Sequence, residues 1–87
     1  MNILEKAQHI VNGDRAQEYG NANLCFNKIA VMWSAYLGHY LTPHDVTQMM
    51  VLLKVCRGSA KREYQEDSIL DIAGYCLCAE NIEKESL

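Results

Sequence analysis

The sequence predicts an all-α fold: a single domain of four helices packed like a four-helix bundle with short connectors. Apolar residues recur every three or four positions in four separate stretches, and no stretch alternates apolar and polar residues as a β-strand would. Helix start and stop signals bound these stretches, and the 87 residues include only one proline and five glycines. We expect one domain, 1–87, with helices at about 2–12, 23–38, 43–58 and 65–84.

The first two predicted helices each carry one apolar stripe, which should face the core. Asn2 is placed to cap the first helix, while Gly13 and Gly38 end the first and the second. The polar connector between them contains Arg15 and Tyr19, which either bind a ligand or form a solvated loop. The stripes consist of Ile3, Ala7, Ile10 and Val11 in the first helix, and of Phe26, Ile29, Ala30, Trp33 and Leu37 in the second.

The third helix has the strongest start signal in the chain. Thr42 stands at the N-cap, Pro43 at the first helical position and Asp45 three residues after the cap. The run from Met49 to Leu53 is apolar all the way round, which predicts a central helix surrounded by partners. One face of this helix carries Val46, Met49, Leu53 and Cys56, and another carries Met50, Lys54 and Arg57.

The fourth helix carries Asp67 and Asp71 one turn apart, at the head of a stripe that continues with apolar residues. A short connector should fold this helix antiparallel to the third, which brings Lys54 and Arg57 beside the two acids. Partly buried charges must be paired. This seam is therefore either a structural contact that fixes the register of two helices or a partly open site. Gly74, in mid-helix, predicts a close approach by a neighbouring helix.

An open seam has the chemistry to bind a nucleotide. Carboxylates one turn apart can hold Mg²⁺ through its waters, and Mg²⁺ brings phosphates with it. Cationic side chains then contact the phosphate oxygens. The candidate contacts are Asp67 and Asp71 for the metal, Lys54, Arg57 and Arg15 for phosphate, and Tyr19 or Trp33 for the base.

Composition and charge narrow the remaining possibilities. The net charge is −3 and no run of Lys or Arg occurs, which argues against binding of a nucleic-acid polymer. The hydrophobic share of 49% is high for so small a domain, so we expect a homo-oligomer, such as a dimer. No apolar run approaches the ~20 residues that span a bilayer, and we expect a cytoplasmic protein with four free thiols.

Four segments support a resemblance over residues 3–79: NGDRAQEYG, FNKIAVMWSAYLG, LTPHDVTQMMVLLKVCR and EDSILDIAGY. In this order they resemble an uncharacterised family of small phage and prophage proteins, which implies a phage origin and no particular activity. The stretch 67–75 is also similar to MazG-like nucleotide pyrophosphohydrolases, which implies Mg²⁺-dependent nucleotide chemistry. Those enzymes pair Glu-x-x-Glu with Glu-x-x-Asp on neighbouring helices, whereas here the third helix holds only Asp45.

Two functions follow. In the first, the seam binds a nucleotide and, in the stronger form of the hypothesis, hydrolyses it. In the second, the chain is a non-enzymatic interaction module that docks on a host or phage protein, for example to inhibit a defence system. The exposure of the four seam charges distinguishes the two, because a ligand site must be open to solvent.

Overall fold

The computed structural model describes residues 1–14 and 22–86, and contains no β-strand in these two ranges. The all-α prediction is therefore confirmed. The elements, in chain order, are α1 (Ile3–His9), a π-helical turn (Ile10–Asp14), α3 (Ala22–Leu37), α4 (Pro43–Gly58), a 3₁₀ turn (Ser59–Lys61) and α5 (Glu66–Ser86).

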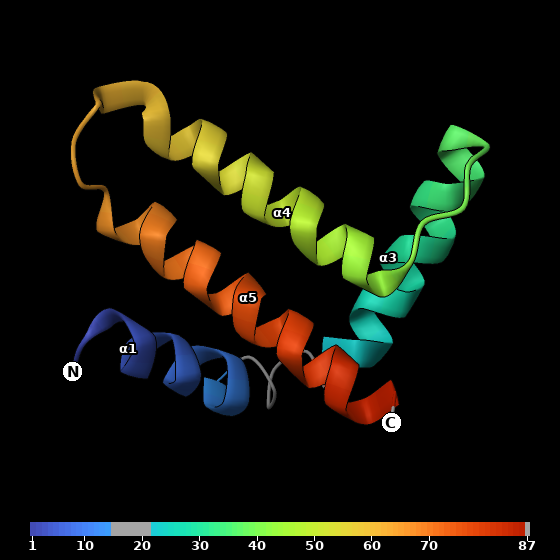
Figure 1. Ribbon diagram of the computed structural model, residues 1–87, viewed down its shortest axis with the longest axis horizontal. Coiled ribbons are helices and arrows are strands. Elements are labelled where there is room, and N and C mark those ends of the chain that lie inside the picture. The colour runs from blue at the N-terminus through green and yellow to red at the C-terminus, as the bar shows by residue number, and fades with distance from the viewer. Residues whose placement is uncertain (15–21, 87) are drawn as a thin grey trace.

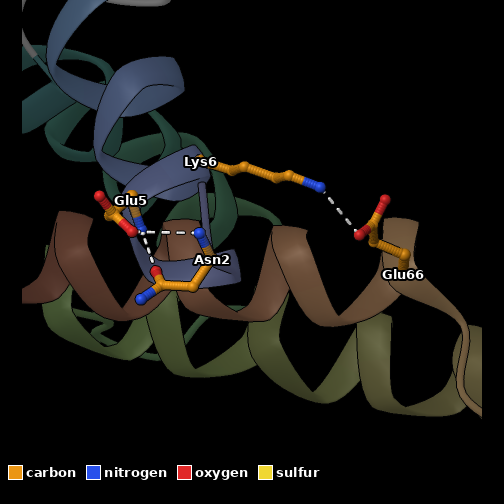
Figure 2. Close-up of polar contacts among 4 residues, drawn as sticks. All are labelled: Asn2, Glu5, Lys6 and Glu66. Atoms are coloured by element: carbon orange, nitrogen blue, oxygen red, sulfur yellow. Dashed lines mark hydrogen bonds and ion pairs between the residues drawn. The ribbon is translucent and has the colours of Figure 1, made fainter.

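Side-chain caps explain where α1 and α4 begin, as predicted from the sequence. The Asn2 side chain accepts a hydrogen bond from the Glu5 N–H at 2.9 Å, and the Glu5 carboxylate accepts from the Asn2 N–H at 3.1 Å (Figure 2). The same reciprocal pair joins Thr42 and Asp45 at 3.0 and 2.9 Å. Each cap satisfies backbone donors that the helix leaves unpaired, and is typically worth ~1 kcal/mol.

Helices α4 and α5 run antiparallel, α1 lies along the other side of α5, and α3 crosses one end of the pair (Figure 1). Lys6 extends from α1 to Glu66 at the start of α5, where Nζ and Oε1 lie 3.0 Å apart (Figure 2). The arrangement differs from an up-and-down bundle because α3 crosses the other helices steeply. Its C-terminal half stands away from them (Figure 1).

Among the described residues, the hydrophobic core cluster lies at the end of the molecule where α3 crosses. It is formed by the buried side chains of Phe26, Ala30, Val46, Cys78 and Ile82. Val11, Ile29, Trp33, Met50 and Tyr75 pack against this cluster. The apolar stripe expected beyond Asp71 on the fourth helix therefore does face the core.

At the opposite end α4 and α5 are in close contact at Gly58. A Cβ added to Gly58 would lie 3.1 Å from the Cβ of Ser68, which is tighter than normal packing. A Cβ added to Gly74 would meet Val11 Cγ2 at 3.5 Å, an ordinary contact. The close approach predicted at Gly74 therefore occurs at Gly58 instead.

One prediction about α4 is wrong for a single chain. Val46 and Thr47 are fully buried and Met50 packs on the core, but the face of Met49 and Leu53 points outward. Their side chains are 36% and 45% exposed. The expectation of a helix enclosed on every side is not met by the described residues of this chain.

Candidate functional site

The predicted seam lies where the C-terminal part of α4 runs beside the N-terminal part of α5 (Figure 1). Lys54 Nζ lies 3.1 Å from Asp71 Oδ2, so these two residues form an ion pair. The Lys54 side chain is 19% exposed and that of Asp71 44%. One turn before Lys54, Met50 packs against the core. The pair thus stands at the border between the core and solvent, where both charges stay partly hydrated.

The other two seam charges do not join this pair. Arg57 and Asp67 are exposed, and neither forms an ion pair with another described residue. A step of three residues rotates the side-chain direction by about 300°, which is about 60° the other way round. Arg57 therefore lies to one side of Lys54 on the helix surface. The structure therefore brings together one cation and one acid of the four. The assignment of Lys54, Arg57, Asp67 and Asp71 to phosphate and metal contacts stays a prediction.

The seam fits Mg²⁺ poorly. Nowhere in ranges 1–14 and 22–86 do three or more His, Cys, Asp or Glu side chains form a group that could hold a metal ion. Asp67 and Asp71 would have to bind the ion as a pair, yet the Asp71 carboxylate already faces the Lys54 ammonium. A divalent cation at that carboxylate would be repelled by Lys54 at a distance of a few ångströms.

Of the remaining predicted contacts, Trp33 lies within the described residues. Arg15 and Tyr19 lie outside the described residues. Trp33, the alternative contact for a base, lies on α3 and packs against the core cluster. An open hollow beside α1 contains none of the seam residues, being lined by Met1, Glu5, Gln8, His9, Asn12 and Gly13.

Asp45 acts as the capping-box partner of Thr42, as predicted, at the end of α4 remote from Lys54. The Thr42 backbone N–H, 2.9 Å from Asp45 Oδ2, holds the pKa of this carboxyl below its usual value of 3.8. The Thr42 hydroxyl lowers the pKa further, and partial desolvation opposes both effects. The carboxylate is thus ionised at neutral pH, with its Oδ2 bonded to the start of α4.

Two exposed apolar surfaces are the most unusual feature of the described chain. The first, the α3 outer face, is defined by Leu24, Lys28, Val31, Met32 and Tyr36. Leu24, Val31, Met32 and Tyr36 are 64%, 70%, 60% and 89% exposed. Leu24 and Val31 lie opposite the buried Phe26 and Ala30, and Met32 and Tyr36 continue the surface toward the flank of the helix. Single exposed hydrophobic residues are normal, whereas a row of them along one helix marks an interaction surface.

The second surface, the α4 outer face, is defined by Met49, Leu52, Leu53, Val55 and Cys56. Leu52 and Val55 are 68% and 51% exposed, more than Met49 and Leu53 at the edge of the face. No charged residue interrupts this set, and it covers the side of α4 that points away from α5.

Sequence reasoning treated these residues as core or left them unassigned. The signal was present, because both 22–37 and 43–58 carry apolar residues on opposite faces of one helix. Within the described residues, the neighbouring helices cover only one of the two faces of each. The Lys6–Glu66 pair was also missed, since residues 60 positions apart give no local pattern.

The chain belongs to a family described as a domain of unknown function (DUF6378), whose model matches residues 2–83. The Gene 55 protein of Mycobacterium phage L5 is 47% identical over 76 residues, which cover 86% of this chain and 48% of that protein. The Gene 55 protein of Mycobacterium phage D29 is 39% identical over 83 residues, covering 95% and 54%. No solved structure matches the chain significantly.

These matches confirm the resemblance to an uncharacterised phage family, and they show no MazG-like similarity. The chain spans about half the length of the curated relatives it matches. Among the described residues, no helix is both long enough and apolar enough to cross a membrane.

Proposed function

We propose that this phage protein is a non-catalytic interaction module that binds another protein, of the host or of the phage, through the α3 outer face. The observation that carries the proposal is the exposure of 60–89% at Leu24, Val31, Met32 and Tyr36 along one helix. Burial of such side chains is worth about 1.5–3 kcal/mol each before the entropic losses of association.

The chemistry of this face indicates the kind of partner. Lys28 is the only charged residue of α3 and stands among the apolar side chains of the outer face. A buried ammonium must be paired. The matching surface is therefore an apolar groove with one carboxylate near its middle, and the Tyr36 ring and hydroxyl suit the rim of such an interface.

A binding experiment on substituted proteins tests this proposal. Val31→Lys places a charge in the middle of the α3 outer face, and Gln8→Lys makes the same charge change on an exposed position of α1. Affinity capture from phage-infected host cells should yield a protein that wild type and Gln8→Lys retain and Val31→Lys loses. The captured protein, once purified, should bind with the same dependence. Equal retention by all three forms would rule out the α3 outer face.

Nucleotide binding is the second candidate, and one observation favours it. Arg57 and Asp67 are exposed beside the Lys54–Asp71 pair, and neither has an ionic partner among the described residues, so a ligand can reach them. Arg57 would contact phosphate, while hydrolysis lacks support because the pair fits Mg²⁺ poorly.

A thermal-shift panel of nucleotides with and without Mg²⁺ tests this second candidate. Binding would raise Tm by mass action. Arg57→Ala should abolish the rise, and Lys61→Ala, which removes an exposed cation outside the seam, should preserve it. A panel without any shift for the wild-type protein would end the nucleotide hypothesis.

A further inference from the structure

The second exposed surface points to a different occupant. We infer that the α4 outer face binds a second copy of this chain, with the two α4 helices antiparallel about a twofold axis. This inference shares one assumption with the proposed function, that an exposed apolar helix face is a binding surface. It concerns the α4 outer face, to which the proposed function assigns no partner. Area, charge pattern and the contrast with α3 support it.

The chain as a whole exposes more surface than a compact monomer of its size. The chain has an accessible surface of 6318 Å², whereas a compact monomer of 9.9 kDa would have about 5,200 Å². The radius of gyration is 13.5 Å, against about 12 Å for a compact domain of this length. The excess, summed over the whole chain, is about 1,100 Å², which is larger than the about 800 Å² per partner that a standard interface buries, so the chain has surface to spare for a contact with a second copy.

The charge pattern of α4 is self-complementary. Asp45, Met49, Leu53 and Arg57 recur at intervals of four residues, so they form one row along the helix, called here the α4 row. The row reads acidic, apolar, apolar, basic. An antiparallel copy reverses this order, which places Met49 against Leu53 of the second copy and Asp45 against its Arg57.

Each charge of the row is available for such a contact. Arg57 is exposed and makes no ion pair within the described part of the chain. Asp45 uses Oδ2 for the Thr42 N–H, and its carboxylate keeps a negative charge and a second oxygen. An isologous interface repeats every contact. A twofold axis therefore forms the Asp45–Arg57 pair twice, once in each direction between the two copies.

The α3 outer face lacks this property. Its only charge is Lys28, in the middle of the row, and a symmetric antiparallel contact there would bring two ammonium groups together. Like charges oppose such an interface. The two surfaces therefore suit different partners. The α4 outer face suits a second copy of this chain, and the α3 outer face suits a protein of different sequence.

Mass measurement across protein concentrations tests the inference. Light scattering and sedimentation equilibrium from micromolar to millimolar protein should show a species of twice 9.9 kDa. Leu53→Lys should give a monomer at concentrations where the wild-type protein is dimeric. Arg57→Glu, which sets like charges against Asp45 of the second copy, should weaken the dimer at least tenfold. Val31→Lys, on the α3 outer face, should leave the dimer unchanged.

Thiol alkylation gives a second readout that needs no substitution. Cys56 lies in the α4 outer face and Cys76 is exposed on α5. Cys56 should become protected from alkylation as concentration rises, while Cys76 reacts at a constant rate. A monomer at every concentration, or a dimer that Val31→Lys dissociates and Leu53→Lys does not, would overturn the inference. A monomer that still captures a protein through Val31 would overturn the dimer alone and leave the proposed function standing.

Discussion

Removing one charge at a time from the Lys54–Asp71 pair should reveal an asymmetry set by exposure. Lys54 is the more buried partner at 19%, and Asp71 is 44% exposed. Asp71→Asn leaves a cation on the less exposed side chain, whereas Lys54→Met leaves a carboxylate on the more exposed one. We therefore expect Asp71→Asn to destabilise the protein more than Lys54→Met does.

The magnitudes follow from two limits. An exposed ion pair contributes ~0–1 kcal/mol, and breaking a fully buried pair costs about 3–5 kcal/mol. A pair that remains partly hydrated lies near the lower limit. Asp71→Asn should cost about 1–2 kcal/mol and Lys54→Met less than ~1 kcal/mol. For a domain of this size the first loss lowers Tm by roughly 5–15 °C.

The free energy of unfolding of both single variants and of the double variant is measured by urea and thermal unfolding, monitored by circular dichroism at neutral pH and low salt. The double variant should cost less than the sum of the single ones, because the pair is lost only once. Equal losses in the two single variants, or a larger loss in Lys54→Met, would refute the reasoning. It would mean that the ion pair does not hold in solution.

Two further predictions concern local structure. Gly74→Ala should stabilise the protein by about 0.5–1 kcal/mol, since alanine favours the helix and the added Cβ makes an ordinary contact. Gly58→Ala should instead destabilise it, because the added Cβ would lie 3.1 Å from the Cβ of Ser68 on α5. Urea unfolding measures both, and the same sign for the two variants would contradict the packing described. The pKa of Asp45 is lowered by the Thr42 N–H, so its contribution to stability is complete above pH 3.8, the ordinary value, and is lost as pH falls through the folded value. Tm measured from neutral to acid pH should therefore fall less steeply in Asp45→Asn than in the wild type, and parallel profiles would show that the cap bond does not perturb this carboxyl.

Local chemistry made part of the fold predictable. The Thr42 cap, Pro43 and Asp45 lie within four residues of one another, so α4 begins where the sequence alone places it. Gly38 ends α3 with a φ of +67°, a conformation that glycine adopts readily. Caps and turns depend on neighbours in sequence, and tertiary packing rarely changes them.

The crossing of α3 was not predictable in this way. Its stripe was read correctly as far as Trp33, but the angle depends on contacts between separate elements. The Ser34 hydroxyl accepts a hydrogen bond from the Leu41 N–H at 2.8 Å, which ties the turn after α3 to the helix. Leu37 was expected in the core and is 55% exposed, because the C-terminal half of α3 extends beyond α4 (Figure 1).

The seam was predictable as a region and not as a geometry. Antiparallel packing of α4 and α5 follows from their short connector, and it brings Lys54 near the acids of α5. Which acid it meets depends on helix rotation, and one residue corresponds to a turn of 100°. The sequence therefore could not show that Lys54 forms its ion pair with Asp71, or that Arg57 and Asp67 remain exposed.

The small core connects stability to association. Its large buried side chains are Phe26, Val46 and Ile82, all at one end of the molecule, and a domain of this length is marginal when it stands alone. A second copy on the α4 outer face would bind the folded form only, so Tm should rise with protein concentration. Calorimetry over a hundredfold range of concentration should show this rise in the wild type and in Val31→Lys. In Leu53→Lys, Tm should stay constant at the value the wild type approaches on dilution. Light scattering should detect the dimer over a certain range of concentration. If the wild-type Tm did not change across that range, the interface would form without stabilising the fold. That result would contradict the view that dimerisation through the α4 row stabilises the folded chain.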